Sequence, residues 1–168
     1  MTSARVILSD GSVALVDAED LPLVSQFKWT RYKRGRLAYA RANGRQRGGV
    51  RGSPFSMHRL LLLPDPGMDV DHINGDGLDN RRCNLRPATR SQNLGNMRKT
   101  RGRSRYKGLH WHSRDRLWVV RVSHQGTSYS GGCFKDEVDA ALAYDRLALR
   151  LFGEFARTNF LRPAGWAS

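Results

Sequence analysis

A strongly basic stretch, RKTRGRSRYK, divides the chain at residues 98–107. It holds six basic residues in ten, with one glycine and few apolar side chains. A segment of this composition is typical of an extended linker, and it could follow a phosphate backbone. We therefore expect a basic linker at residues 101–105, with separately folded parts on either side.

The chain as a whole is also basic. Its formal net charge is +14 and its sequence pI is about 11.0. Basic groups gain affinity for nucleic acid by releasing counterions from phosphates, so an anionic partner, and first of all nucleic acid, is expected. A basic surface that only solubilises the protein is the alternative. The sequence contains no evident basic amphipathic helix, which argues against an acidic membrane surface.

With 168 residues, 39% of them hydrophobic, the chain can form one ordinary domain or two to three small ones. The N-terminus lacks the apolar core of a signal peptide, and the longest aliphatic run, residues 60–63, is stopped by Pro64. We expect a soluble, cytoplasmic protein. Cys83 and Cys133 lack the CxxC spacing of zinc sites, and we expect both to be packing residues.

Residues 1–55 are predicted to form a β-rich region. The run RVILSDGSVALV indicates two short strands around Asp10-Gly11, a dipeptide that readily adopts the positive φ angles of a tight turn. Further strands are expected at residues 28–32 and 36–42, separated by the basic turn KRG. The arginines and lysines of this region could contact a DNA backbone or only solvate the sheet.

The stretch from residue 68 to residue 84 is rich in Asp, Asn and Gly and is predicted to be a loop. Thr89 is then a good N-cap, and Gln92 completes a capping box. We expect a helix that begins at Arg90 and carries Asn93 in its first turns.

Beyond the basic stretch, three strands are predicted, with turns at residues 113–116 and 125–126. A helix should follow, capped by Asp136. Its apolar residues recur at helical spacing, so that one face of the helix should pack on one side of the sheet and leave the other side open.

Asp71 and His72 bring together two groups that phosphodiester cleavage requires. The reaction needs a base that takes a proton from water and a cation that neutralises charge on the phosphate. Histidine titrates near neutral pH, and a carboxylate is a ligand for a hard ion such as Mg²⁺. An Asx-rich turn with a hydrogen-bonded surface histidine explains the same residues equally well.

Other metal sites do not fit the spacing. An EF-hand loop that began at Asp71 would have non-ligand residues at two of its ligand positions, and a structural zinc site would need a second His or Cys near His72. Asp76 and Asp79 are expected to form turns and to pair with neighbouring arginines rather than to bind metal.

The run from Met57 to about Asn96 resembles the HNH endonucleases of the phage and homing type. The matching elements are Asp71-His72, Leu78-Asp79-Asn80, Asn84-Leu85, and Thr89 through Asn93. The resemblance implies a ββα-metal nuclease core over residues 56–100.

The roles of the family's residues carry over by position. His72 is implied as the general base, and Asn84 as the residue that braces the site and orients His72. Asp71 and Asn93 are implied as ligands of one Mg²⁺ or Mn²⁺. The amide oxygen of Asn93 favours a hard ion over zinc.

The segment from Tyr106 to Phe160 resembles the DNA-binding domain of plant ethylene-response and APETALA-type transcription factors, which also occurs in phage endonucleases. Matching positions include Tyr106-Lys107-Gly108, Ala143-Tyr144-Asp145, Phe152-Gly153 and Asn159-Phe160. The resemblance implies that residues 106–162 form a three-stranded sheet backed by one helix, with the open face of the sheet in the major groove.

Several basic side chains are candidates for DNA contact. Strand alternation places His110, His112 and Arg114 on one face of the first C-terminal strand, and Arg121 on the corresponding face of the second. For His58, a buried hydrogen-bonded ring is an equal alternative. The complete set of predicted DNA contacts is His58, Arg59, Arg101, Arg103, Arg105, Lys107, His110, His112, Arg114 and Arg121.

The sequence thus predicts an α+β protein that acts as a metal-dependent DNA endonuclease of the phage or homing type, nicking or site-preferring. Double-stranded DNA is the expected partner, no protein partner is implied, and the protein is expected to be a monomer in the host cytoplasm if it is phage-encoded. A non-catalytic, sequence-specific DNA-binding regulator is the alternative, and a structure-specific or RNA-directed nuclease also stays open. Removal of residues 103–168 is expected to weaken DNA binding without dismantling the metal site.

Overall fold

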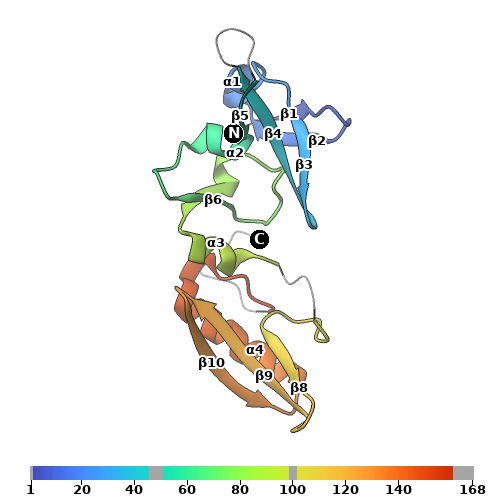
Figure 1. The fold of residues 1–168 in the computed structure, drawn as a ribbon, viewed down its shortest axis with the longest axis vertical. Helices are drawn as coiled ribbons and strands as arrows, with labels where there is room; N and C mark the ends of the chain where they lie inside the picture. Colours follow the sequence, from blue (N-terminus) through green and yellow to red (C-terminus); the bar gives the residue numbers. More distant parts are fainter. Residues whose placement is uncertain (1, 46–50, 99–101, 161–168) are drawn as a thin grey trace. The chain divides into compact units, whose positions relative to one another are not determined.

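The computed structural model describes residues 2–45, 51–98 and 102–160 (Figure 1). The chain forms two compact units, Met1–Ala88 and Thr89–Ser168. Both units combine helices with small antiparallel sheets, which confirms the predicted α+β class. No helix within the described ranges is long and apolar enough to cross a membrane.

The first unit begins with a hairpin of β1 (Ser3–Ile7) and β2 (Val13–Asp17). Gly11 in its turn has a φ of 81°, the left-handed conformation that the Asp-Gly dipeptide predicts. The 3-10 turn η1 (Ala18–Asp20) and helix α1 (Leu21–Val24) follow. The next sheet has the order β3-β4-β5 and consists of β3 (Thr30–Arg34), β4 (Leu37–Arg45) and β5 (Arg51–Ser56).

Helix α2 (Met57–Leu62) ends where Leu63 adopts a left-handed conformation immediately before Pro64. Two short antiparallel strands, β6 (Asp69–His72) and β7 (Leu85–Ala88), then flank a polar loop at residues 73–84. The 3-10 turn η2 (Arg82–Asn84) closes this loop before β7.

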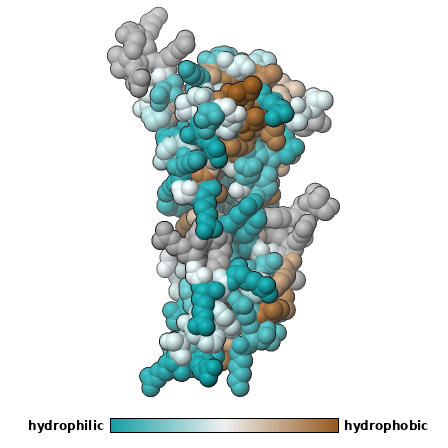
Figure 2. Space-filling model, turned by 90° about the vertical axis from the view of Figure 1, so that its right-hand side faces the viewer, coloured by the Kyte–Doolittle hydropathy of each residue, from teal (hydrophilic) through white to brown (hydrophobic). Residues whose placement is uncertain are grey.

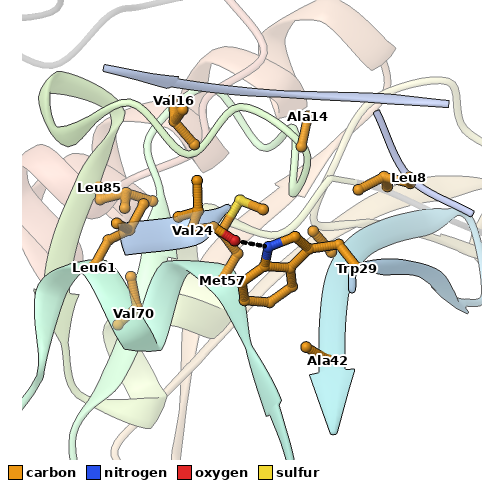
Figure 3. Packing of buried hydrophobic residues seen from close by; sticks show 11 residues of the cluster. Leu8, Ala14, Val16, Val24, Trp29, Ala42, Met57, Leu61, Val70 and Leu85 are labelled. Atoms are coloured by element: carbon orange, nitrogen blue, oxygen red, sulfur yellow. Dashed lines mark hydrogen bonds between the residues drawn. The ribbon is translucent and has the colours of Figure 1, made fainter. Parts of the chain in front are cut away.

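One hydrophobic core joins these elements (Figure 3). Val16 from β2, Met57 from α2 and Val70 from β6 are all buried in it. The indole Nε1 of Trp29 donates a hydrogen bond to the carbonyl of Val24 at 2.8 Å, which satisfies its polar atom inside the core. The N-terminal hairpin and the β6–β7 pair therefore share a single core.

The second unit begins with α3 (Arg90–Asn96) and continues with β8 (Leu109–His112), β9 (Leu117–His124) and β10 (Thr127–Phe134). These strands form an antiparallel sheet of order β10-β9-β8, joined at the two predicted turns. Helix α4 (Glu137–Phe152) packs on one face of the sheet, and η3 (Gly153–Phe155) follows it (Figure 1).

Local signals explain the second unit well. The carboxylate of Asp136 caps α4 by accepting hydrogen bonds from the backbone N–H groups of Val138 and Asp139. The buried carboxylate of Asp145 accepts hydrogen bonds from the backbone N–H groups of Asn159 and Phe160, both at 2.7 Å. These hydrogen bonds join two motifs that lie apart in the sequence, Ala143-Tyr144-Asp145 and Asn159-Phe160. They tie the segment after η3 to α4.

The two cysteines differ from the prediction. Cys83 and Cys133 are exposed rather than packed in a core. Cys133 lies on β10, where its neighbours alternate between the two faces of the sheet, so that its side chain points away from α4.

Figure 2 shows a largely hydrophilic surface with separate hydrophobic patches.

Candidate active site

Asp71 and His72 are the last two residues of β6, and both side chains are buried. The antiparallel register places Arg86 of β7 opposite Asp71 and Leu85 opposite His72. Nε and Nη2 of Arg86 each lie 2.9 Å from Oδ2 of Asp71. This cross-strand ion pair compensates the buried charge of Asp71.

The ring of His72 is held by Asn80. Nε2 of His72 lies 3.1 Å from Oδ1 of Asn80, and Nδ2 of the same amide donates to the carbonyl of Leu78 at 3.2 Å. Since the amide nitrogen is directed to Leu78, the amide oxygen faces the ring, and this oxygen can only accept. Nε2 of His72 therefore carries the proton, and the lone pair of the neutral ring lies on Nδ1.

The surroundings of His72 favour its neutral form. Burial lowers the pKa of His72, whereas the hydrogen bond to Asn80 and the charges of Asp71, Asp76 and Asp79 act in the opposite direction. Because the net effect is a pKa below the usual 6.5, the ring is mainly neutral at pH 7. A neutral ring is the form that a general base requires.

Two further rings, Tyr39 on β4 and His58 on α2, pack around His72. The centroid of the His58 ring is 4.9 Å from that of His72 in an edge-on arrangement, and the centroid of Tyr39 is 5.9 Å from that of His72. Burial lowers the pKa of His58 to about 3, and the positive charges of His72, when it is protonated, and of Arg59 act in the same direction. Within the described part of the chain, Nδ1 of His58 is buried and has no hydrogen-bond partner.

These contacts decide between the two alternatives for His58. A neutral, half-buried ring is poorly suited to the predicted phosphate contact, so the structure favours the packed alternative, although the buried Nδ1 lacks the expected hydrogen bond. Arg59 is exposed, and its Nη1 donates to the carbonyl of Met68 at 3.1 Å.

Asn84 braces the loop rather than the histidine ring. Its Oδ1 accepts a hydrogen bond from the backbone N–H of Asn74 at 2.9 Å. Its Nδ2 donates to the carbonyl of Asp79 at 2.7 Å and to Oδ1 of Asn74 at 3.1 Å. The ring hydrogen bond predicted for Asn84 is made by Asn80 instead. The sequence signal for Asn80 was present in the matched element Leu78-Asp79-Asn80.

The acidic residues of the loop behave as expected. Asp79 forms a bidentate pair with Arg81, with distances of 2.8 Å from Nε to Oδ1 and 2.7 Å from Nη2 to Oδ2. Oδ1 of Asp76 accepts a hydrogen bond from the backbone N–H of Leu78 at 3.0 Å, which closes an Asx turn. The prediction of turn formation and arginine pairing is confirmed.

The N-terminal region holds the same loop, which the sequence did not reveal. Leu15 of β2 donates its backbone N–H to the carbonyl of Leu78 at 2.8 Å and accepts from the N–H of Asn80 at 2.7 Å. Nε and Nη2 of Arg82 donate to the buried carboxylate of Asp20 at 2.9 and 2.7 Å. The β-rich region therefore stabilises the loop that positions Asn80.

Asn93 lies on α3 in the second unit. Oγ1 of Thr89 accepts from the N–H of Gln92 at 3.3 Å, and Oε1 of Gln92 accepts from the N–H of Thr89 at 2.8 Å. The predicted capping box and the start of the helix at Arg90 are confirmed.

The donor chemistry fits the predicted hard cation. Asp71 offers a carboxylate oxygen and Asn93 an amide oxygen, the ligand types that Mg²⁺ and Mn²⁺ prefer. Within residues 2–45, 51–98 and 102–160, no group of three or more His, Cys, Asp or Glu side chains could hold a metal ion.

The sheet of the second unit presents some of the predicted DNA contacts together. His110 pairs with Val119 and Arg121 pairs with Ser130, so that His110, Arg121 and Ser130 share the face away from α4. All three are exposed.

His112 is the last residue of β8, and Arg114 follows in the turn to β9. Nδ1 of His112 is 3.1 Å from a carboxylate oxygen of Asp115. Arg114 lies in the turn after β8, outside the strand, so strand alternation does not set the direction of its side chain.

Three described residues of the basic stretch make contacts within the second unit. The guanidinium carbon of Arg103 is 4.9 Å from the ring centroid of Trp111, and that of Arg105 is 4.9 Å from the ring centroid of Tyr106. Lys107 turns inward, because its Nζ donates to the carbonyl of Gly95, and burial lowers the pKa of Lys107 to about 8. This position does not suit the predicted phosphate contact. Arg101 lies outside the described residues.

Comparison with known proteins identifies the family. A family model described as HNH endonuclease matches residues 62–94, which include Asp71, His72, Asn84 and Asn93. The chain is also similar to a protein of Acanthamoeba polyphaga mimivirus named "Uncharacterized HNH endonuclease L560", with 30% identity over 157 residues, covering 89% of this chain and 75% of that protein. No solved structure matches the chain. The site geometry and these similarities agree, and the chain belongs to the HNH endonuclease family.

Proposed function

We propose that the chain is a metal-dependent DNA endonuclease in which Nδ1 of His72 takes a proton from the attacking water. The observation that carries the proposal is the contact between Nε2 of His72 and Oδ1 of Asn80. This contact leaves the basic lone pair on Nδ1 of His72. Burial lowers the pKa of the same ring. The family resemblance supports the same role for His72.

The proposed reaction is hydrolysis of a phosphodiester. The water oxygen forms a bond to phosphorus, and the water proton moves to Nδ1 of His72. The bond from phosphorus to the 3′-oxygen breaks, and this oxygen leaves with the bonding electron pair and takes a proton from solvent water. Asn80 keeps its hydrogen bond to Nε2–H throughout, so the ring does not turn during the transfer. The charges of Asp71 and Asp79 favour the imidazolium that forms.

The proposed cation is Mg²⁺ or Mn²⁺, and the family resemblance carries the assignment of Asp71 and Asn93 as its ligands. When bound, such an ion neutralises charge on the phosphate and on the leaving oxygen. The ion pair with Arg86 keeps the Asp71 carboxylate at the end of β6, next to the proposed base.

We propose further that the open face of the β8–β10 sheet holds duplex DNA, as the resemblance to the plant DNA-binding domain implies. His110, Arg121 and Ser130 are exposed on one face, so this face offers donors to bases and phosphates. A monomer with one active site is expected to nick one strand.

Supercoiled plasmid tests the proposal directly. Wild-type protein with Mg²⁺ or Mn²⁺ should give open-circular product, and EDTA should prevent its formation. His72→Ala should shift DNA on a gel as wild type does but should not nick it, and added imidazole should restore part of the nicking by the cavity variant His72→Gly. If wild type shifts DNA but cuts neither plasmid nor genomic DNA with either ion, the protein is a DNA-binding regulator and the enzyme proposal is wrong.

A further inference from the structure

We infer that Lys107 and Ser91 are positioning residues that fix α3, and with it Asn93, to the body of the C-terminal unit. The inference rests on the proposed metal role of Asn93 and deepens it. All of the contacts that carry it lie within Thr89–Ser168.

The C-terminal end of α3 is held at the carbonyl of Gly95. This oxygen accepts a hydrogen bond from Nζ of Lys107 and another from the backbone N–H of Arg157 at 3.1 Å. Lys107 is itself fixed, because its N–H donates to Oδ1 of Asn159 at 2.7 Å and its carbonyl accepts from Nδ2 of Asn159 at 3.3 Å. A cation at the last carbonyls of a helix is also favoured by the helix dipole.

The first turn of α3 is held at Ser91. Its Oγ accepts a hydrogen bond from the backbone N–H of Gln125 at 3.1 Å and lies 3.2 Å from Nδ1 of His124. His124 ends β9, and Gln125 begins the turn to β10. The start of α3 is therefore bonded to the turn of the sheet whose open face carries Arg121.

Phe152 of α4 contacts a residue at each of these two anchors, His124 and Gly95. Its ring packs edge-on against the ring of His124, with centroids 4.9 Å apart. The same ring lies against Gly95, where an added Cβ would come within 2.6 Å of Cδ1. Glycine at this position thus lets α3 approach α4 closely.

Helix α3 is so short that its order depends on these contacts. The helix has seven residues, and isolated helices shorter than about 12 to 15 residues are marginal in water. Its order must come from tertiary contacts, and those described here belong to the C-terminal unit. Removal of residues 103–168 should consequently release α3, which differs from the expectation that the metal site survives this truncation.

Lys107 allows a sharp test, because its two possible roles predict different results. A phosphate contact predicts that Lys107→Met lowers the salt slope of DNA binding by about 0.9. A positioning role predicts an unchanged slope, faster hydrogen exchange of the α3 amides, and an Mn²⁺ dissociation constant that rises about ten-fold, as for other residues that support metal ligands. Ser91→Ala should show the same pattern in a variant that keeps every charge.

The full-length chain serves for all variants. Lys135→Met is the matched control, because Lys135 is exposed in the same unit and its loss removes the same charge. Mn²⁺ binding is followed by electron paramagnetic resonance without DNA, and exchange in β8–β10 reports whether the unit is folded. Lys107→Arg keeps the charge and the donors and should restore the exchange protection of α3.

The inference would be overturned if Lys107→Met and Lys135→Met showed equal hydrogen exchange of the α3 amides and equal affinity for Mn²⁺. It would also be overturned if the salt slope of DNA binding fell in Lys107→Met but not in Lys135→Met. If wild type neither binds Mn²⁺ nor nicks DNA, the proposed function fails. Faster α3 exchange in Lys107→Met and Ser91→Ala would in that case still support their positioning of the helix.

Discussion

Nε2 of His72 and Oδ1 of Asn80 lie 3.1 Å apart, and this contact selects the ring nitrogen that is able to act as a base. The amide is itself oriented, because its Nδ2 donates to the carbonyl of Leu78. The backbone of Asn80 is bonded to Leu15 of the N-terminal hairpin. The tautomer of His72 thus depends on contacts that reach far along the chain.

Asn80→Ala should lower the single-turnover nicking rate by about 10- to 100-fold, because the ring loses the acceptor that holds its proton on Nε2. Asn80→Asp should keep more activity, since a carboxylate also accepts from Nε2. Its added charge should raise the pKa of His72 and move the acid limb of kcat/KM to higher pH, whereas the limb of wild type lies below the usual 6.5. Equal rates for the alanine variant and wild type would contradict this role of Asn80.

Arg86→Met should destabilise the first unit by about 3 to 5 kcal/mol, because it leaves the buried carboxylate of Asp71 without its cation. The double variant Asp71→Asn/Arg86→Met should recover much of this loss, since it removes both charges. Urea unfolding measures both effects. Arg5→Met, at an exposed position of β1, is the control and should change stability by less than about 0.5 kcal/mol. A double variant no more stable than Arg86→Met would contradict the uncompensated-charge explanation.

Local sequence signals predicted local structure correctly. The Asp-Gly turn at Gly11 and the capping box of Thr89 are set by residues within a few positions of one another, so they can be inferred without tertiary information. The pair of Arg82 and Asp20 joins residues 62 positions apart, and no local pattern predicts it. The same limit applies to Lys107, whose inward direction depends on the fold of the C-terminal unit.

Some residues of the candidate site were predicted from the sequence, whereas the role of Asn80 depends on the fold. The resemblance pointed to Asp71, His72, Asn84 and Asn93 because the spacing of these residues is a property of the sequence. The choice of Asn80 rather than Asn84 as the partner of the histidine ring depends on how the loop folds back, which its spacing does not reveal.

Arg121→Ala should weaken binding of duplex DNA, because the exposed guanidinium lies on the open face of the sheet with His110 and Ser130. If Arg121 reads a guanine, discrimination against the wrong base should fall by about 1 to 3 kcal/mol, measured by competition with unrelated DNA. The nicking rate at saturating DNA should stay unchanged. Arg150→Ala removes an exposed arginine from the last turn of α4 and is the control. The assignment of the open face as the DNA-binding surface is contradicted if Arg150→Ala weakens binding as much as Arg121→Ala does.

His58 should make the protein sensitive to mild acid. Its pKa is about 3 in the folded chain, because burial disfavours the charged ring, against a usual value of 6.5. Between these values the unfolded chain binds a proton that the folded chain does not, so this contribution to stability is complete above about pH 6.5 and is lost as the pH falls. From pH 7 to pH 5 the loss should be about 2 kcal/mol. His58→Phe keeps a ring against Tyr39 and His72 but cannot titrate, so its free energy of unfolding should change less between these pH values, as urea titrations would measure. His110→Phe, at an exposed position, should leave the wild-type difference in place. An undiminished difference in His58→Phe would mean that another buried group carries the acid sensitivity.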